Sequence, residues 1–523
     1  MPPQRRYNLT TMKHLRWWWL LIGSLLLTGC GTALAQAPSW HVPTPTPVPL
    51  HVPTTTPRVT PTIWAPGAFS PTATATPTPD PTRRPPYIYY TQAGDTLPAL
   101  AVRFGVHPDE IKANTPLSPT GLLSPNIMLI IPRRLGKTSS NIHLIPDSEI
   151  VYSPSAIDFS VRDYVAQTAG FLSTYHEYLQ STGTTTGADI VANIALNNSI
   201  NPRLLLALLE YQGKWVFSQP QTDLQRDYPL GHISERYQGL YRQLAWAVNQ
   251  LSIGYYGWRE GLLTSLTFGD GSSIRLAPDL NAGTVALAYF FAQVSPNAAA
   301  WRRQMDAQNG FPAFYARMFG DPWARAYTVE PLYPPNLTQP RLILPIQKGT
   351  VWYFTGGPHG AWEHDGARAA LDFAPGSVHG GCGVSRLWAV AVAPGVVVRS
   401  GNGVVMLDLD GDGKEQTGWD ILYLHIADEG RVPAGAHLHT GDFIGHPSCQ
   451  GGVATGTHIH IARKYNGEWI AADGPIPFVM DGWVPHAGKK PYQGTLTKDG
   501  KTIPACPCGS PEQAISRDDG QDA

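Results

Sequence analysis

Two histidines separated by a single residue stand out in the stretch GTHIHIARKYNG, residues 456–467. On a β-strand, residues i and i+2 project to the same face, so His458 and His460 would point into one space. Two imidazoles aimed at one space are typical of a metal ligand beside a catalytic base. Because a catalytic zinc takes three protein ligands and keeps one position open for water, further ligands must come from elsewhere in the chain.

The region around this pair is rich in such ligands. Ten of the 17 histidines fall within residues 359–486, where short alternating apolar runs are separated by turns rich in Gly, Pro and Asp. This pattern predicts an all-β antiparallel domain over 340–490. Within it, the stretch YFTGGPHGAWEHDGARAALDF contains His359, His364 and Asp372.

Together with the stretch ILYLHI, which contains His425, these motifs resemble the lysostaphin-type and β-lytic zinc endopeptidases. Members of that family are peptidoglycan hydrolases with a duplicated hybrid motif, and the resemblance covers about residues 342–485. It implies three ligands for Zn²⁺, namely His359, Asp372 and His460. It also implies that His458 and His425 assist catalysis by moving protons or stabilising the oxyanion.

The assignment of His359 depends on motif spacing. The commonest family spacing is H-x-x-x-D, but Arg368, a poor zinc ligand, stands four residues before Asp372. The β-lytic branch has a longer insertion after TGGPHG, and here His359 precedes Asp372 by thirteen residues. This spacing favours His359, and His364, eight residues before Asp372, is the alternative ligand.

A second H-x-H pair, His437 and His439, lies in VPAGAHLHTGDFIG. This stretch is similar to a turn-rich part of the family in which those positions vary and are usually exposed. The pair at 458 and 460 is instead preceded by Gly-Thr and followed by a strand and an Asn-Gly turn, as in the family. We therefore expect the later pair to be the functional one.

The implied reaction is zinc-dependent hydrolysis of peptide cross-bridges in peptidoglycan. Zinc would polarise the peptide carbonyl and activate water, and no glutamate of an HExxH motif is needed or present in the sequence. Gly–Gly, D-Ala–Gly and D-Ala–diaminopimelate links all remain open as substrates. The alternative function is a non-catalytic cell-wall-binding or regulatory lipoprotein, although the full ligand set favours an enzyme.

Residues 87–133 are predicted to form a small βααβ module. Its strands would be Tyr87–Thr91 and Ile127–Ile131, and its helices would be Leu97–Phe104 and Pro108–Asn114. The GDTL motif after the first strand and the terminal LIIP resemble a LysM module over its whole length. The resemblance implies binding to glycan that contains N-acetylglucosamine, and a spacer without a ligand is the alternative.

Residues 155–330 are predicted to be mostly helical. The stretch NPRLLLALLEYQGKW resembles the catalytic helix of lysozyme-like lytic transglycosylases, with Gln212 at the position of the catalytic acid. A glutamine amide cannot protonate a glycosidic oxygen, and Glu210 would lie about 200 degrees away around the helix. We therefore interpret the region as a non-catalytic lysozyme-like domain, and a glycosidase acting through it is the alternative.

The N-terminus is typical of an exported protein. Basic residues precede the apolar run WWWLLIGSLLL, and the following LTGC is similar to a bacterial lipobox ending at Cys30. We expect a lipoprotein signal peptide over 1–30, a Pro/Thr-rich stalk over 31–86, and membrane attachment through lipidated Cys30. A secretory signal cleaved near residues 33–35 is the alternative, and both interpretations place the protein outside the cytoplasm at the cell wall.

The charge balance of 38 Lys+Arg against 39 Asp+Glu argues against a nucleic-acid partner. Of the cysteines after Cys30, Cys382 and Cys449 could pair within the peptidase domain. Cys506 and Cys508 lie in a predicted tail over 491–523, and their partners cannot be assigned from the sequence. A cysteine-based zinc site is the alternative, but the CxC pair lacks a second matching pair.

The stretch DLDGDGKEQTGW begins at Asp408 and matches the start of a calcium loop, with aspartates at its first, third and fifth positions. Its twelfth position is Trp419, where an EF-hand has glutamate. A charged hairpin tip is therefore favoured over a calcium site.

Overall fold

The computed structural model describes residues 84–376 and 381–517. The predicted signal peptide, the lipidated Cys30 and nearly all of the stalk lie outside the described residues. Within the described ranges, no helix combines the length and the apolar character that crossing a membrane requires.

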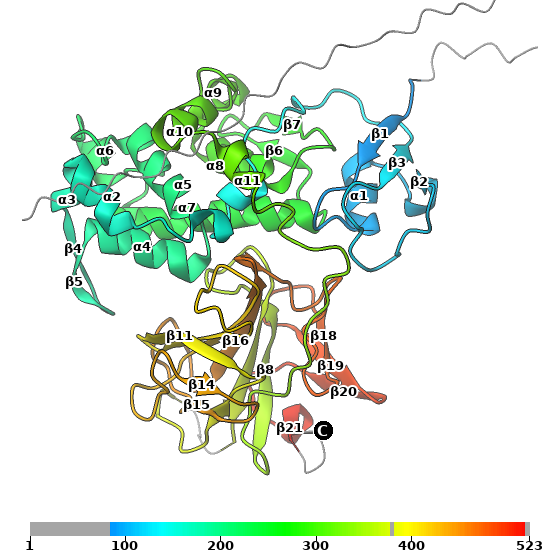
Figure 1. The fold of residues 1–523 in the computed structure, drawn as a ribbon, viewed down its shortest axis with the longest axis vertical. Coiled ribbons are helices and arrows are strands. Elements are labelled where there is room, and N and C mark those ends of the chain that lie inside the picture. The colour runs from blue at the N-terminus through cyan, green and yellow to red at the C-terminus, as the bar shows by residue number, and fades with distance from the viewer. Residues whose placement is uncertain (1–83, 377–380, 518–523) are drawn as a thin grey trace, which may run out of the picture. The chain divides into compact units, whose positions relative to one another are not determined.

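The first described region is a small three-stranded antiparallel sheet with one α-helix (Figure 1). Strands β1 (Tyr87–Tyr90) and β3 (Met128–Ile131) pair along their length, and helix α1 (Leu97–Phe104) covers them with buried apolar side chains. The Thr96 hydroxyl accepts a hydrogen bond from the first turn of α1, and Gly105 ends the helix in the left-handed conformation.

The second helix expected over Pro108–Asn114 is not formed, and this corrects the predicted βααβ order. A single 3-10 turn, η1 (Pro108–Glu110), is followed by a short strand, β2 (Lys112–Ala113), which pairs with β3. The strand forms in place of the helix because Ile111 is buried against the sheet, while Lys112 and Ala113 gain backbone hydrogen bonds at its edge.

The middle region is helical, as expected from the sequence, and it carries two short hairpins. Helix α8 (Ala282–Val294) packs against α7 (Leu240–Arg259) where Gly254 approaches the Ala286 backbone. The helices are α2 (Val161–Thr168), α3 (Phe171–Thr174), α4 (Gly187–Asn198), α5 (Pro202–Leu208), α6 (Asp223–Asp227), α7 (Leu240–Arg259), α8 (Ala282–Val294), α9 (Ala298–Gln304), α10 (Phe311–Phe319) and α11 (Pro322–Ala326). The hairpins are β4 (His176–Leu179) with β5 (Gly183–Thr186), and β6 (Ser265–Thr267) with β7 (Ser273–Arg275).

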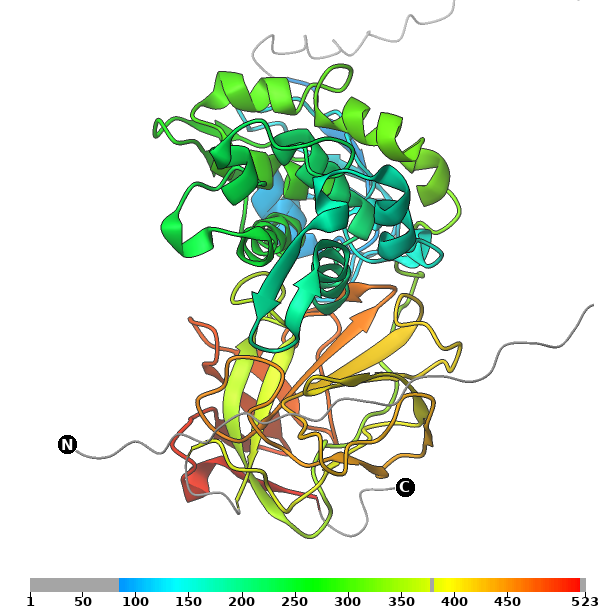
Figure 2. The ribbon, with the colours of Figure 1, turned by 90° about the vertical axis from the view of Figure 1, so that its left-hand side faces the viewer.

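The C-terminal region is built on a nine-stranded antiparallel sheet, seen from two directions in Figures 1 and 2. Its order is β14-β11-β12-β13-β16-β9-β8-β21, with β17 paired to β16. The strands are β8 (Val351–His359), β9 (Ala370–Pro375), β11 (Gly395–Gly401), β12 (Val404–Asp408), β13 (Trp419–Leu424), β14 (His437–Leu438), β16 (Ile459–Tyr465), β17 (Glu468–Trp469) and β21 (Ala514–Ser516). A separate pair joins β10 (Ala389–Val390) to β15 (Phe443–Gly445).

The two faces of this sheet are buried differently, as the alternation of side chains along a strand requires. On β16, Ile459 and Ile461 belong to the core of the C-terminal region, whereas Ala462 packs with residues of the helical region. Hydrogen bonds also join the helical region to β17, the strand paired with β16. The Tyr255 hydroxyl donates to Glu468 at 2.9 Å, and the Trp469 backbone N–H donates to the Tyr256 hydroxyl at 3.0 Å. The face that carries His460 is therefore the one that meets the helical region.

The segment predicted as a tail from residue 491 is folded through residue 517, which corrects that expectation. Strands β18 (Val484–Ala487), β19 (Gly494–Lys498) and β20 (Lys501–Pro504) form a small sheet, and β21 closes the edge of the large sheet beside β8. Ile515 of β21 is 3% exposed, so this last strand contributes to the core. These strands were not predicted because they are too short, at three to five residues, to show a clear alternation of apolar side chains.

Candidate metal centre

Three neighbouring strands bring the three expected zinc ligands together. His359 ends β8, Asp372 lies in the middle of β9, and His460 lies near the start of β16. Asp372 is the register partner of His460 on one side and of Gly356 on the other. Residues directly opposite in antiparallel strands share a face, so the side chains of Asp372 and His460 emerge side by side.

Their ligand atoms form a compact group in which all lie within 4.8 Å of one another. The His359 Nε2 atom is 3.0 Å from the His460 Nδ1 atom. The Asp372 Oδ1 atom is 3.3 Å from the first of these nitrogens and 3.4 Å from the second. All three residues are buried, with exposed fractions of 2% for His359 and 6% for Asp372 and for His460.

Backbone carbonyls assign the imidazole protons of these two histidines. His359 Nδ1 donates to the Gly357 carbonyl at 2.8 Å, and His460 Nε2 donates to the Ala361 carbonyl at 2.9 Å. Each ring then keeps a lone pair on the nitrogen that faces the group. This is the arrangement in which a ligating histidine is usually held, because the second nitrogen fixes both the tautomer and the ring orientation.

The same arrangement recurs in the two histidines expected to assist catalysis. His458 Nδ1 donates to the Gly456 carbonyl at 2.7 Å, and His425 Nδ1 donates to the Gln450 carbonyl at 2.9 Å. The His458 Nε2 atom lies 3.8 Å from the Asp372 Oδ1 atom, and the His425 and His458 ring centroids are 4.5 Å apart. In both rings Nδ1 is hydrogen-bonded to a carbonyl, which leaves Nε2 as the second ring nitrogen beside the ligand group.

The electrostatics of the group fit a divalent cation. Asp372 Oδ1 is buried and receives no hydrogen bond from the described part of the chain, although three imidazole nitrogens lie within 4 Å of it. Two neutral nitrogen lone pairs and a carboxylate oxygen thus face one another, which is unfavourable unless a positive charge lies between them. Two histidines and one carboxylate are also a recognised ligand set for catalytic zinc.

The pKa shifts of the group follow from burial and from the Asp372 charge. Burial lowers the pKa of His460, and burial together with the neighbouring His458 and His460 lowers the pKa of His425 to about 3. Burial opposes protonation of His359, but the Asp372 charge outweighs burial and raises its pKa. Burial alone would raise the pKa of Asp372, yet its contacts with His359 and His460 hold that pKa well below its usual range.

His425 has an unusual backbone conformation that turns it toward this group. It follows the last residue of β13 and has a φ of +69°, in the left-handed region that non-glycine residues seldom adopt. Its backbone carbonyl accepts hydrogen bonds from the backbone N–H and the hydroxyl of Ser448. Such conformations persist where the surrounding contacts enforce them, and they concentrate at functional sites.

Two glycines of the TGGPHG motif lie where a larger residue would clash with its neighbours. A Cβ at Gly356 would lie 2.3 Å from Asp372 Oδ2, so only glycine leaves room for that carboxylate. A Cβ at Gly357 would lie 2.6 Å from the Gln493 carbonyl. These glycines let the end of β8 pass close to β9 on one side and to the 492–494 segment on the other.

Sequence reasoning missed Tyr492. Its ring stacks on His359, with centroids 4.0 Å apart and planes 23° from parallel, and its carbonyl accepts the Gly357 backbone N–H at 2.9 Å. The residue lies in the segment predicted to be a tail, and no motif there signals a role. Only the fold brings it to the ligand group.

The remaining candidates lie elsewhere. His364 is exposed and outside the ligand group, in a loop where Asp365 bonds with Asn249. The H-x-H pair at 437 and 439 is exposed, as expected, with the His439 side chain 92% exposed. In the helical region, Glu210 accepts hydrogen bonds from the backbone N–H groups of Val216 and Phe217, so it stabilises a turn.

Two disulfides are present in the described residues. Cys382 pairs with Cys449, as the sequence allowed, and Cys506 pairs with Cys508. The first bond joins two loops beside the histidines, because Gln450 accepts from His425 and the Thr457 backbone N–H donates to the Gly381 carbonyl. It thereby supports the part of the chain that orients His425.

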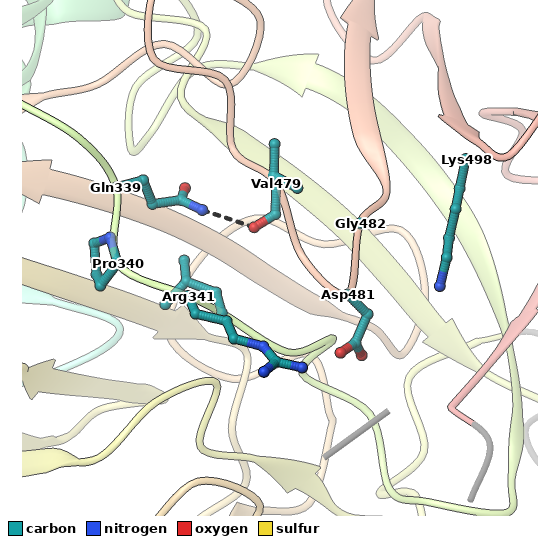
Figure 3. A pocket seen from close by; sticks show the side chains of 8 residues that line it. Gln339, Pro340, Arg341, Val479, Asp481, Gly482 and Lys498 are labelled. Atoms are coloured by element: carbon teal, nitrogen blue, oxygen red, sulfur yellow. Dashed lines mark hydrogen bonds between the residues drawn. The ribbon is translucent and has the colours of Figure 1, made fainter. Parts of the chain in front are cut away.

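A pocket elsewhere in the C-terminal region does not involve these histidines (Figure 3). It lies where the segment around Gln339 meets residues 479–482 and Lys498. The Gln339 amide donates to the Val479 carbonyl at 2.7 Å, and Asp481 accepts the Leu344 backbone N–H at 2.8 Å. These contacts attach the segment that enters the C-terminal region.

Comparison with known proteins adds a second line of evidence. A family model described as the LasA N-terminal domain matches residues 143–335, which include the whole predicted helical region. The chain is also 25% identical over 350 residues to Protease LasA of two Pseudomonas aeruginosa strains, across 63% of this chain and 75% of that protein. This aligned length exceeds the family match, so the similarity extends beyond the helical region. The chain is LasA-like, and the lysozyme-like resemblance finds no counterpart in these matches.

Solved structures give more limited similarities. The M23 metalloprotease pseudoalterin from the deep sea is 20% identical, with a TM-score of 0.28, covering 34% of this chain and all of that chain. The catalytic domain of lysostaphin from Staphylococcus simulans is 20% identical, with a TM-score of 0.17, covering 23% of this chain and 87% of that domain.

The ligand group and the similarity to Protease LasA together define the class of the protein. It is an enzyme, a zinc metalloendopeptidase, and its cofactor is Zn²⁺. It has a helical middle region followed by a C-terminal region of antiparallel sheets.

Proposed function

We propose that this zinc metalloendopeptidase hydrolyses peptide cross-bridges of bacterial peptidoglycan. The observation that carries the proposal is a set of four histidines that each donate one ring N–H to a backbone carbonyl. In three of them the other ring nitrogen lies within 4 Å of Asp372 Oδ1, and the His425 ring lies beside His458. Such a set can hold a metal and still provide two basic nitrogens, which is what hydrolysis of an amide requires.

The proposed roles follow from these positions. His359 Nε2, Asp372 Oδ1 and His460 Nδ1 would hold the ion, which supplies Lewis acidity toward a peptide carbonyl and toward water. His458 Nε2, close to Asp372, would take the proton of the attacking water. His425 Nε2 would donate a hydrogen bond or a proton to the oxygen or the leaving nitrogen once it is protonated.

Residues 87–133 would keep the enzyme on its substrate. The resemblance to a LysM module supports binding to glycan with N-acetylglucosamine, although the second helix of the expected module is replaced by η1 and β2. Ile88, Tyr90 and Ile130 form an exposed apolar group on this small sheet. Tethering to glycan would raise the local concentration of peptide at the histidines without changing their chemistry.

Anchoring is a separate part of the proposal. The lipobox-like sequence before Cys30 supports a lipoprotein attached to the membrane and exposed to the cell wall, with a secretory signal as the alternative. The second candidate function, a non-catalytic wall-binding protein, keeps its glycan-binding module but predicts no bond cleavage.

The test uses the full chain, loaded with zinc, on purified peptidoglycan. We expect new amino groups to appear without new reducing ends, because peptide bonds and not glycosidic bonds are cut. Asp372→Asn removes the carboxylate that faces three imidazoles and should abolish release. His439→Ala, which alters the exposed H-x-H pair, is the matched control and should act like the wild type.

The outcomes separate the candidates. Release of reducing ends alone would contradict an endopeptidase and point to the helical region. If wild type and both variants release neither product while binding the glycan, the non-catalytic function replaces the proposal. Equal release by wild type and Asp372→Asn would show that the ligand group described here is not the active site.

A further inference from the structure

A second group of metal-binding side chains lies at the other end of strand β13. Asp408, Asp410 and Asp412 each offer a carboxylate oxygen, and these oxygens lie within 4.8 Å of one another. Asp408 ends β12 and is fully buried, whereas Asp410 and Asp412 lie in the exposed hairpin that leads to β13. Acidic groups of this kind are common without an ion, so this cluster alone identifies nothing.

The residue Asp420 provides a second, independent observation beside this cluster. This residue of β13 is fully buried, and neither of its carboxylate oxygens receives a hydrogen bond from the described residues. Asp420 and Asp408 are direct register partners on neighbouring strands, so their side chains leave the same face of the sheet side by side. An unpartnered, fully buried carboxylate thus stands next to the innermost member of the cluster.

The neighbouring cations form hydrogen bonds with Glu415 and none with Asp420. Lys464 is its register partner on the other side, but the Lys464 ammonium donates to Glu415 at 3.0 Å. Arg399 also binds Glu415, through two hydrogen bonds of 3.0 and 3.1 Å. Burial raises the pKa of Asp420 well above its usual range against the opposing charge of Lys464, and the charges of Glu415, Asp408 and Asp410 add to that rise.

We propose that Asp408, Asp410, Asp412 and Asp420 bind a calcium ion. The ligands are all carboxylate oxygens, which suit hard cations and disfavour zinc or copper. Three come from alternate positions of one hairpin, and the fourth comes from the adjacent strand, in place of the glutamate that Trp419 displaces. A flexible loop with many oxygens favours Ca²⁺ over the smaller Mg²⁺, which demands a stricter octahedral arrangement.

Calcium would account for contacts that otherwise oppose folding. Carboxylates directly opposite each other on neighbouring strands are unfavourable, and a buried carboxylate without a partner costs more still. The backbone already holds the loop in place: Asp408 accepts N–H groups from Asp410, Gly411 and Gly413, and Asp412 accepts one from Lys414. These bonds orient the carboxylates but add no positive charge.

The experiment measures calcium binding to the full chain at fixed, saturating zinc, independently of peptidase activity. Ca²⁺ is titrated to about 10 mM, because extracellular calcium modules have Kd values on the order of 10⁻⁴ to 10⁻³ M. We expect a rise in Tm of about 3 °C at a tenfold excess over Kd. We also expect Tb³⁺ emission excited through Trp419, with Ca²⁺ displacing the Tb³⁺.

Two variants and one control test the ligands. Asp420→Asn keeps the shape of the buried side chain but removes its charge, so it should raise Tm in calcium-free buffer and abolish the calcium-dependent rise. Asp410→Asn alters an exposed ligand and should weaken calcium binding at least tenfold without affecting folding. Asp499→Asn, in a turn of the β19–β20 hairpin, should respond to calcium like the wild type.

Three results would overturn the proposal. The first is a wild-type protein whose Tm and Tb³⁺ emission do not respond at 10 mM Ca²⁺. The second is a response of Asp420→Asn and Asp410→Asn equal to that of the wild type. The third is an equal response to Mg²⁺, which would remove the selectivity that the oxygen-rich loop implies. Because activity is not measured, failure here leaves the proposed peptidase function unaffected.

Discussion

The two ends of strand β13 carry two candidate metal sites that are built in different ways. At one end, four histidines and Asp372 meet at a group of mixed nitrogen and oxygen ligands that is almost entirely buried. At the other end, three aspartates of a hairpin group their carboxylate oxygens, two of them exposed, and the buried Asp420 is the register partner of the third. Both groups lie on the same face of the sheet, separated by about 17 Å of extended strand.

The two sites differ in the hydrogen bonds that their candidate ligands make. At the histidine end, backbone carbonyls take one N–H from each ring and leave the other nitrogen free, so the ligands are prepared before a metal arrives. At the aspartate end, no donor from the described residues reaches Asp420, and burial raises its pKa against the opposing charge of Lys464. We therefore expect the first site to bind tightly and to support catalysis, and the second to bind weakly and to affect stability.

The largest effect is expected from the ligands at the histidine end. His359→Ala should lose zinc, and its peptidase activity should fall to background, because a three-ligand site keeps too few ligands. His364 was the alternative ligand in the sequence analysis. His364→Ala should keep zinc and nearly full activity, since His364 is exposed and outside the ligand group. Metal analysis and release of amino groups from peptidoglycan measure both effects. Loss of zinc from His364→Ala with retention in His359→Ala would reverse the assignment.

A smaller effect is expected from the histidines beside the ligands. His458→Ala and His425→Ala should keep zinc, whereas kcat should fall by about 10²–10⁴-fold because proton transfer is lost. His437→Ala serves as the control, since this exposed histidine belongs to an identical H-x-H motif. If His458→Ala loses zinc to the same extent as His359→Ala, then His458 is a ligand and the division of roles is wrong.

The sequence predicted the histidine end better than the rest because period-two alternation and motif order both apply there. The H-x-H spacing places His458 and His460 on one face of a strand, and Asp372 then emerges beside His460 by strand register. The choice between His359 and His364 came from motif context, and the fold places only His359 within the group. The alternation along a strand indicates the face on which a side chain lies, but it does not reveal which loops come together in the fold.

Other features had no local signal. Tyr492 reaches His359 only because the chain returns after β18, and its surroundings show neither a motif nor a regular alternation. The strand β2 replaced a predicted helix because a few residues can gain more from sheet pairing than from helix propensity. The Asp420 carboxylate could not be linked to the DLDGDG stretch until the register of β12 and β13 was known.

The disulfide between Cys382 and Cys449 should matter for the histidine end alone. Replacing both cysteines by serine opens a link between residues 67 apart, and the free energy of unfolding should fall by about 2–4 kcal/mol. Activity should also fall, because the neighbouring Gln450 orients His425. The control replaces Cys506 and Cys508, which are only two residues apart, and should change stability little. Denaturant unfolding and the calcium-dependent rise in Tm measure the two ends separately.

The smallest effect concerns Glu330, a half-buried carboxyl that does have a partner and so contrasts with the fully buried Asp420. It accepts the Ser148 backbone N–H at 2.8 Å, yet burial, reinforced by the Asp147 charge, raises its pKa to about 7 despite that bond and Arg259. Between its unfolded pKa, about 4.3, and about 7, the folded protein binds more protons, so stability falls as pH rises through this window. Glu330→Gln should remove this part of the pH dependence of stability. The Tm of the variant should therefore rise relative to that of the wild type from pH 5 to 7.5. A constant difference in Tm between wild type and Glu330→Gln across this range would mean that Glu330 is ionised throughout, and that one backbone donor is enough to keep a half-buried carboxylate charged. In that case the missing donors at Asp420 become the decisive difference between the two residues, because burial alone would not hold a carboxyl neutral.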